Sequence, residues 1–319
     1  MNIPGDFGSP WRYQKLIEYI SKFPDEIGPV IREYLNKRGA NNSDKVWWVL
    51  LYSTCYCATS ACVMYEKLNY RVLDKKSLKN FWTDNKSKLI FQSDRRYIKN
   101  MDQFVPIINE FMKKSKRNPW KYISQFVKDT PESTYNALYK EVGSWKYYGR
   151  FSIILFMYNL NKILGIPMKS EKYDWKNGST TTSAIFNARY MDDKAELFEK
   201  DGKLSDEDIN LLDRSLIRIM NVLNKKYPDK NWTIMGVTSD LCSYRKMFKR
   251  TRYLGFYVDR QQEELSKIEK GYPELKSMFK ELWNYRKAFI PHEFLGEVNG
   301  WNGIQKNRMN SWTENGEFR

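Results

Sequence analysis

The segment from Ser239 to Gln261, SDLCSYRKMFKRTRYLGFYVDRQ, interleaves cations with aromatic rings. Phosphate groups need positive charge, and an unstacked base needs a flat apolar face, so this composition suits a nucleic acid. On a helix, Arg245, Lys249 and Arg252 fall at i, i+4 and i+7 and form one basic ridge. The alternative is an amphipathic helix whose basic side is simply solvated. The other residues of interest in this segment are Lys246, Tyr253, Asp259 and Arg260.

A second basic cluster, SDRRYIKN, occupies positions 93–100. Arg95 and Arg96 are adjacent and follow Asp94, so the two guanidinium groups could clamp a phosphate while the carboxylate orients them. Lys99 adds a third cation to this cluster. A solvated turn with a local ion pair is the alternative interpretation.

The sequence WKYYGRFS at 145–152 places Arg150 directly before an apolar run that begins at Phe151. A cation at such a boundary is either a snorkelling side chain or a partly desolvated ligand for an anion. Gly149 favours the second interpretation, because glycine lets a ligand approach the backbone closely.

A run of hydroxyl side chains, DWKNGSTTTSAIFN at 174–187, precedes an expected helix. Hydroxyls and backbone N–H groups that meet at a helix N-terminus form an anion site, to which Ser183 and Asn187 would contribute from one helix face. Simple N-capping is the alternative explanation. The segment lacks the Gly-Lys-Thr step of a P-loop, so ordinary nucleotide hydrolysis is unsupported.

Carboxylates near these cations are candidates for a general base. Asp174 lies between two aromatic residues, so burial could tune its charge. Asp259 stands beside Arg260 and is either a base held by its neighbour or an acid favoured at a helix start. Cys242 lies one turn before Lys246, which would activate an exposed thiol, whereas a buried and inert cysteine is the alternative.

The composition narrows the class of partner and of chemistry. The chain has 319 residues, a formal net charge of +16 and 16% aromatic residues, which favours a folded protein with an anionic partner, nucleic acid first. His292 is the only histidine, which argues against a zinc deaminase or a Ser-His-Asp hydrolase, and we expect no metal and no cofactor. Four cysteines without a disulfide framework indicate a reducing cytoplasm.

Helical periodicity dominates the chain, and we predict a mainly α, compact multi-helix fold. The uncharged stretch 46–65 is interpreted as a buried helix, with a membrane span as the alternative. Short strands are expected only at 88–92 and 231–237. The expected helices cover residues 13–23, 29–37, 45–67, 103–114, 119–127, 132–142, 145–164, 180–190, 206–226, 240–249, 259–270 and 274–289.

Taken in order, four of these segments resemble one family. They are SDRRYIKN at 93–100, YYGRFSIILFMYNLNKILG at 147–165, GSTTTSAIFN at 178–187 and LCSYRKMFKRTRYLGFYVDRQ at 241–261. The set is similar to the bacteriophage amino acid:DNA transferases, also called α-glutamyl/putrescinyl thymidine pyrophosphorylases, over about residues 45–265. The resemblance implies a DNA-glycosylase-like helical domain over residues 1–300, with an N-terminal extension at 1–43 and a polar tail at 301–319.

The resemblance also implies a reaction. An amine of an amino acid or polyamine would displace (pyro)phosphate from the methylene of phosphorylated 5-hydroxymethyluracil in double-stranded DNA, after the base leaves the stack. The implied phosphate ligands are Arg95, Arg96, Lys99, Arg150, Ser183, Asn187, Arg245, Lys249, Arg252 and Arg260, with Lys246 beside the leaving group. The implied bases are Asp174 or Asp259, and the implied stacking rings are Tyr148 or Tyr253. The same resemblance implies an upstream 5-hydroxymethyluracil DNA kinase and the cytoplasm of an infected bacterium.

One feature departs from the glycosylase pattern. A helix-hairpin-helix with a Leu-Pro-Gly-type turn is not evident, and LGEVNGWNGI at 295–304 is a poor substitute for it. Two other functions therefore stay open at this point. One is a non-catalytic nucleic-acid-binding protein of a virus or mobile element, and the other is a DNA glycosylase or nuclease.

Overall fold

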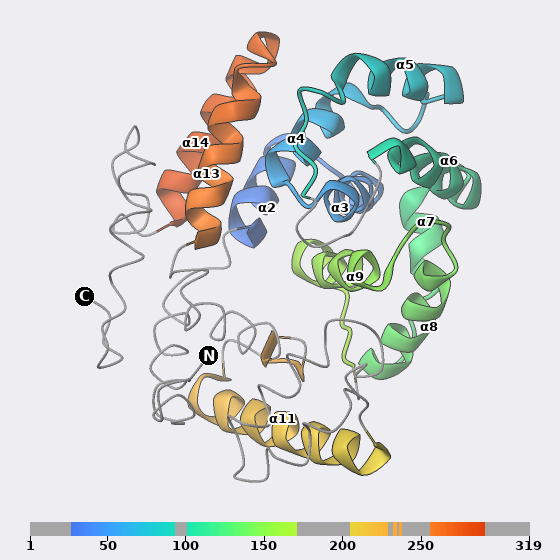
Figure 1. Cartoon of the computed structure of the whole chain (residues 1–319), viewed down its shortest axis with the longest axis vertical. Helices are drawn as coiled ribbons and strands as arrows, with labels where there is room; N and C mark the ends of the chain where they lie inside the picture. The colour runs from blue at the N-terminus through green and yellow to red at the C-terminus, as the bar shows by residue number, and fades with distance from the viewer. Residues whose placement is uncertain are drawn as a thin grey trace. The chain divides into compact units, whose positions relative to one another are not determined.

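A computed structural model describes residues 27–92, 101–170, 205–228, 232–234, 236–237 and 256–290. These parts contain eleven α-helices and no strand, which confirms the mainly α fold (Figure 1). The helices are α2 (Ile27–Lys37), α3 (Asn42–Cys55), α4 (Ala58–Lys67), α5 (Lys75–Asn85), α6 (Phe104–Ser115), α7 (Pro119–Ser124), α8 (Pro131–Gly143), α9 (Arg150–Leu164), α11 (Asp206–Lys226), α13 (Phe256–Glu269) and α14 (Lys276–Phe289). Two short 3₁₀ turns, η1 (Met101–Gln103) and η4 (Pro273–Leu275), precede α6 and α14.

The chain divides into two compact units. The larger unit comprises Pro24–Lys169 and Tyr257–Trp301, and the smaller unit comprises Met1–Phe23, Ser170–Phe256 and Asn302–Arg319. A division by contacts does not decide which parts fold on their own, so the single domain expected over residues 1–300 stays a prediction. The expected glycosylase-like architecture likewise stays a prediction.

The core of the larger unit is built on α3 and α4. Asn41 begins α3 with a capping box: its side chain accepts from the Ser43 and Asp44 backbone amides, and the Asp44 carboxylate accepts from the Asn41 amide. Residues 46–55 of α3 are all buried. Helices α4, α7 and α9 pack against α3. Helix α2 packs against α9, and α14 packs against α2 (Figure 1).

The uncharged stretch 46–65 is not one helix. The expected helix over 45–67 breaks at Tyr56, which adopts a left-handed φ of 52°, and restarts after Cys57, whose sulfur accepts from the Ser60 amide. The two halves pack in the core of the larger unit, as the buried-helix interpretation predicted. In the described part of the chain, no helix is long and apolar enough to cross a membrane.

Aromatic side chains fill much of this core. Trp145 packs edge-on against Phe111 and Phe156, and Trp82 stacks on Phe104. Such ring pairs contribute about 0.5–1.5 kcal/mol each beyond the area that they bury. An ion-pair cluster on the rim joins three helices, because Arg38 at the end of α2 pairs with Glu66 of α4 and Glu281 of α14.

Several sequence predictions differ from the structure. The helix α5 was missed because only Leu78 and Trp82 of its eleven residues are buried, which leaves a weak apolar pattern. Both expected strands are wrong in the described residues. The segment at 88–92 is irregular and ends at Gln92, whose backbone amide donates to the Cys55 carbonyl. In the segment at 231–237, Ile234 and Val237 are helical.

The bounds of the expected helices agree with the structure to different degrees. The helix expected from residue 145 starts at 150. The segment over 206–226 is confirmed to the residue, whereas the helices expected at 13–23, 180–190 and 240–249 and the tail at 301–319 lie outside the described residues.

Candidate functional site

Most of the predicted site residues lie outside the described part of the chain, and they stay predictions. These residues are Arg95, Arg96, Lys99, Asp174, Ser183, Asn187, Arg245, Lys246, Lys249, Arg252 and Tyr253. The structure describes Tyr148, Asp259 and Arg260 fully, and it describes the backbone of Arg150. All four belong to the larger unit, so the candidate site is built from that unit alone.

The first part of the candidate site is the N-terminus of α9. The helix begins at Arg150, and its N-cap is Gly149 with extended backbone angles, φ −72° and ψ 163°. Glycine brings no side-chain acceptor to the first amides of the helix, which therefore keep their capacity to bind an anion. A Cβ added at Gly149 would meet no atom within 4 Å, so a ligand can approach this backbone closely. The Ser152 hydroxyl in the same turn is buried and has no hydrogen-bond partner among the described residues.

Two aromatic rings flank this helix start. Tyr147 adopts a left-handed φ of 64° and leaves 44% of its surface exposed, with the Lys146 ammonium 5.1 Å from the centre of its ring. Phe151 is also exposed and meets the Tyr56 ring edge-on at 6.4 Å. Left-handed backbone is costly for a residue other than glycine and is concentrated at functional sites. The arrangement places partly exposed aromatic rings beside a helix N-terminus that has no side-chain cap.

The position of Tyr148 does not support its expected role as a stacking ring. Tyr148 is 5% exposed, its hydroxyl is hydrogen-bonded to the Ser53 hydroxyl, and its ring packs against Trp145 and Phe156. Both faces of the ring are therefore committed to the core. The sequence reads Tyr-Tyr-Gly here, and no periodicity distinguishes the buried tyrosine from the exposed Tyr147 next to it.

The second part of the candidate site is the first half of α13. Asp259 is 1% exposed, and the Arg260 guanidinium donates to the Glu264 carboxylate at 3.2 Å. Glu264 is itself 6% exposed, so this ion pair is largely withdrawn from water. The structure thus pairs one predicted residue, Arg260, with an acid that sequence reasoning missed, and Asp259 lies on the same helix. The spacing in the sequence could have indicated this pair, because Glu264 follows Arg260 at i+4 on the expected helix. Glu264 also precedes Leu265, which belongs to the apolar face of that helix.

The chemistry of Glu264 is set by burial. Burial raises the pKa of its carboxyl from 4.5 to about 7, although a hydrogen bond with the Cys57 thiol and the charge of Arg260 oppose the shift. A carboxyl group whose pKa lies near neutrality can both accept and release a proton near pH 7, which a general base requires. Glu264 is therefore the described residue whose protonation chemistry best fits a general base.

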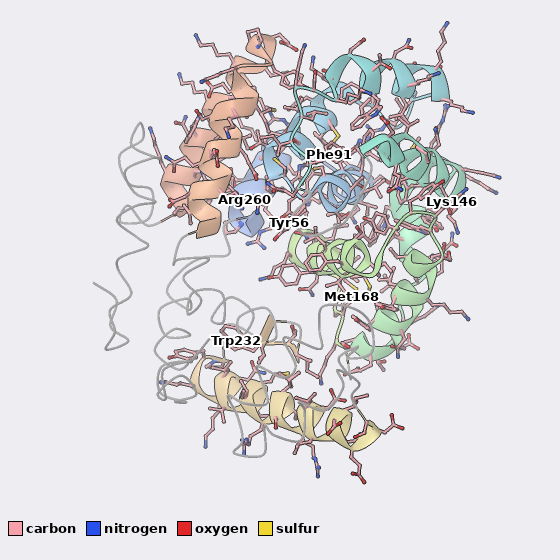
Figure 2. The ribbon with its side chains drawn as sticks, viewed as in Figure 1. Tyr56, Phe91, Lys146, Met168, Trp232 and Arg260 are labelled. Atoms are coloured by element: carbon pink, nitrogen blue, oxygen red, sulfur yellow. The ribbon has the colours of Figure 1, made fainter. Side chains whose placement is uncertain are left out.

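The α3–α4 junction connects the two parts. Tyr56 contacts Phe151 at the start of α9, and the next residue, Cys57, is hydrogen-bonded to Glu264 of α13. In Figure 2, Tyr56 is labelled near α9 and Arg260 on α13. Continuous contacts thus run from the candidate anion site to the buried acid through Tyr56 and Cys57.

The chain was then compared with known proteins. The family described as amino acid:DNA transferase matches residues 25–252. This chain belongs to the amino acid:DNA transferase family. A protein named serinyltransferase, from Salmonella phage ViI, is 24% identical over 311 residues, which cover 85% of this chain and 70% of that relative. No solved structure matches the chain.

The family match confirms the resemblance drawn from the four motifs and establishes a transferase that acts on DNA. It excludes the non-catalytic alternative. It also spans both units of the chain, since residues 25–252 include most of the smaller unit. The basic segments at 93–100 and 241–252, which lie outside the described residues, fall within the matched range.

Metal-ligating groups and thiols were compared across the described residues. No group of three or more His, Cys, Asp or Glu side chains in those residues could hold a metal ion. Cys55, Cys57 and Cys62 are free and buried, and burial raises the pKa of each thiol, so none is present as a nucleophilic thiolate near pH 7.

Proposed function

We propose that this transferase joins the amine of an amino acid to the methylene carbon of phosphorylated 5-hydroxymethyluracil in DNA. The amine forms a C–N bond, the methylene C–O bond breaks with its electron pair, and phosphate or pyrophosphate leaves. The ammonium proton passes to a protein carboxylate. Serine is the first amino acid to test, because the Salmonella phage relative is named a serinyltransferase.

One observation carries this proposal: a helix N-terminus without a side-chain cap, joined by contacts to a buried acid of neutral pKa. The leaving group gains negative charge in the transition state, and backbone amides that are already oriented stabilise such charge without rearrangement. We assign Gly149 and the following amides, with Arg150, to the leaving phosphate. The cations outside the described residues, above all Arg245 and Lys246, remain further candidates for the same role.

Glu264 is the proposed general base, in place of the sequence-based choice between Asp174 and Asp259. An amino acid arrives mostly as its ammonium form at pH 7, and the nitrogen attacks only after it loses a proton. The carboxylate of Glu264 has the matching pKa. Asp259, one turn earlier on α13, is the second candidate.

The exposed aromatic rings suit the flipped base. We assign Tyr147 or Phe151 to stacking, because each has an exposed face beside the proposed phosphate site. A base outside the duplex loses its stacking energy, and an aromatic face restores about 1–3 kcal/mol of it. The upstream kinase and the host cytoplasm, both implied by the family resemblance, belong to the same proposal.

Nucleoside mass spectrometry tests the proposal. DNA that contains 5-(phospho- or pyrophospho-oxymethyl)uracil is incubated with the full chain and L-serine, then with a mixture of amino acids and polyamines. The expected product is a nucleoside with the mass of thymidine plus the donor less two hydrogen atoms. Unchanged DNA, with binding confirmed by a mobility shift, would contradict the choice of 5-hydroxymethyluracil, and the same assay on other modified bases would then identify the acceptor.

A further inference from the structure

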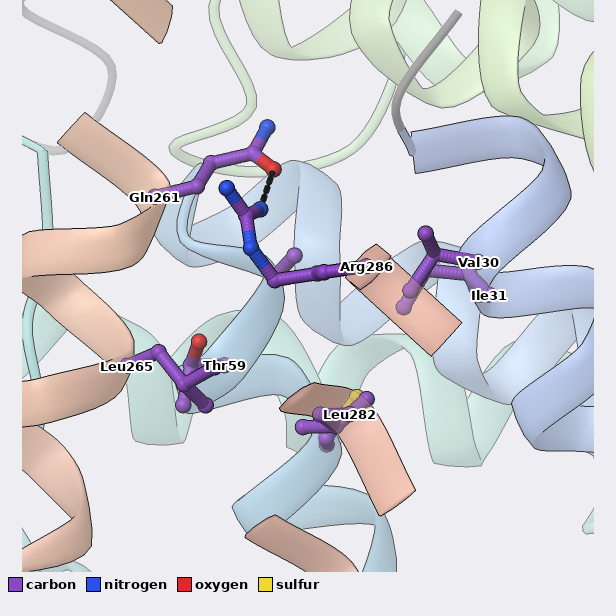
Figure 3. Close-up of a pocket in the computed structure, with 9 residues that line it drawn as sticks. Val30, Ile31, Thr59, Gln261, Leu265, Leu282 and Arg286 are labelled. Carbon is purple, nitrogen blue, oxygen red and sulfur yellow. Dashed lines mark hydrogen bonds between the residues drawn. The ribbon is translucent and has the colours of Figure 1, made fainter. Parts of the chain in front are cut away.

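A small hollow in the larger unit has a polar end and apolar walls. Apolar walls come from α2, α4, α13 and α14, for example from Ile31, Leu265 and Leu282 (Figure 3). Its polar groups are the Arg286 guanidinium, the Gln261 amide and the Thr59 hydroxyl. All lining residues belong to the larger unit.

The guanidinium at the polar end is fixed in place. Arg286 is 4% exposed and donates to the Val258 carbonyl and to Gln261 Oε1, both at 2.9 Å. Figure 3 shows the bond to Gln261 at one end of the hollow. A guanidinium held by two bonds in its own plane loses little freedom when it binds an anion. Carboxylate is the anion that best matches its planar set of donors.

The size of the hollow selects one part of a ligand. The space open to the centre of a water molecule is about 20 Å³, enough for one or two waters. A carboxylate has about that size, whereas a whole amino acid or a polyamine chain does not fit. A ligand would therefore insert its carboxylate and leave its amine and side chain toward the opening.

We propose that this hollow, the Arg286 pocket, binds the α-carboxylate of the amino acid that the transferase uses. The inference rests on the proposed function, because it assumes that a free amino acid is the donor. It also makes the donor more specific, since a polyamine has no carboxylate to insert. Gln261 of the pocket precedes Glu264 by three residues on α13, so the two lie on neighbouring positions of one helix face. The donor amine is thereby brought to the side of the helix that carries the proposed base.

Binding without transfer provides the test. Saturation-transfer NMR on the full chain with an unmodified DNA duplex compares L-serine with ethanolamine and L-glutamate with γ-aminobutyrate, pairs that differ only in the α-carboxylate. We expect each amino acid to bind at least tenfold more tightly than its decarboxylated partner. Equal binding within each pair, or no binding of any amino acid at millimolar concentration, would overturn the inference.

Substitutions in the Arg286 pocket and outside it test where the amino acid binds. Ala58→Leu, from the first turn of α4, fills the pocket without altering its polar groups, and Arg286→Lys keeps the charge but loses the planar fork. Both should weaken amino acid binding at least tenfold, while Lys280→Ala, an exposed change on the same helix as Arg286, should not. Circular dichroism confirms that each variant is folded. Should Arg286→Lys unfold, Ala58→Leu decides alone, and full affinity in folded Ala58→Leu would refute the site.

The two proposals fail in different ways. In one outcome, amino acids bind through their carboxylate and Ala58→Leu abolishes this binding, but no transfer to phosphorylated 5-hydroxymethyluracil occurs. That result would contradict the proposed acceptor and support the pocket. In the other outcome, transfer uses serine and ethanolamine equally, which would support the acceptor and contradict the pocket.

Discussion

Replacing Glu264 with glutamine tests whether a buried carboxylate ionises in the folded protein. Glutamine keeps the shape of the side chain and mimics its neutral form. The pKa of the Glu264 carboxyl is raised from 4.5 to about 7, and each unit corresponds to about 1.4 kcal/mol, so ionised Glu264 costs about 3 kcal/mol of folding free energy at high pH. The folded state therefore binds the proton more tightly than the unfolded state, and the associated stability is present below pH 4.5 and lost as pH rises through 7.

The measurable quantity is the difference in unfolding free energy between Glu264→Gln and the parent protein. Any constant effect of the substitution cancels when this difference is followed against pH. From the two pKa values, the difference should grow in favour of the variant by about 2.5 kcal/mol between pH 5.0 and pH 8.5. Urea unfolding followed by tryptophan fluorescence gives it at each pH, provided that the variant and the parent share one m value.

The matched control is Glu263→Gln, one residue away on α13, where the side chain pairs with Lys267 near the surface. This variant removes a carboxylate from the same helix, so it shows how much of the pH dependence is specific to position 264. Parallel curves for Glu264→Gln and the parent would refute the assignment of a raised pKa to this carboxyl. If Glu264 is also the base, the variant should lose at least a hundredfold in transfer rate while Glu263→Gln keeps its rate.

Three further predictions concern the candidate site and its surroundings. Gly149→Asp gives α9 a capping carboxylate and should stabilise the protein by about 0.5 kcal/mol. For DNA that carries the phosphorylated base, the slope of log affinity against log salt concentration should fall by about one phosphate contact, and an unchanged slope would refute the phosphate site. Tyr148→Phe removes the hydroxyl bonded to Ser53 and should cost about 1 kcal/mol of stability without changing the transfer rate of folded protein; a rate loss would restore Tyr148 to the site. Cys55, Cys57 and Cys62 should resist iodoacetamide in native protein at pH 8 and react fully in urea, as peptide mass spectrometry would show.

The sequence predicts those features of the fold that depend on local chemistry. Ser205 and Asp208 form a capping box, and the helix that they begin was placed at the right residues. The break at Tyr56 could not be predicted, because no glycine or proline marks it and the stretch around it is uniformly apolar. What decides the break is tertiary: the Gln92 amide binds the Cys55 carbonyl from another segment, and helix α9 supplies Phe151 to the Tyr56 ring.

In the candidate site, too, the sequence predicts features that depend on local residues and misses those that depend on tertiary contacts. Residue type and spacing placed Arg150 directly before an apolar run and Asp259 beside Arg260, but the helix that begins at Arg150 was expected five residues earlier. Sequence patterns give burial only on average, so they did not show that Tyr148 lies in the core or that burial raises the pKa of Glu264. Arg286 was also missed, because its significance lies in contacts with α13 that are 25 and 28 residues away in sequence.

The strained junction between α3 and α4 contacts the start of α9, Glu264 of α13 and the Arg286 pocket. Left-handed backbone at Tyr56 costs about 1–2 kcal/mol relative to a continuing helix, so the surrounding contacts must favour it. Those contacts lead in two directions, from the Tyr56 ring to Phe151 at the start of α9 and from the Cys57 thiol to Glu264 on α13. The residues that follow, Ala58 and Thr59, line the Arg286 pocket. A continuous helix would turn these four residues to different faces, so the break allows one short segment to contact the start of α9, Glu264 and the Arg286 pocket, the three places to which we assign phosphate, base and donor.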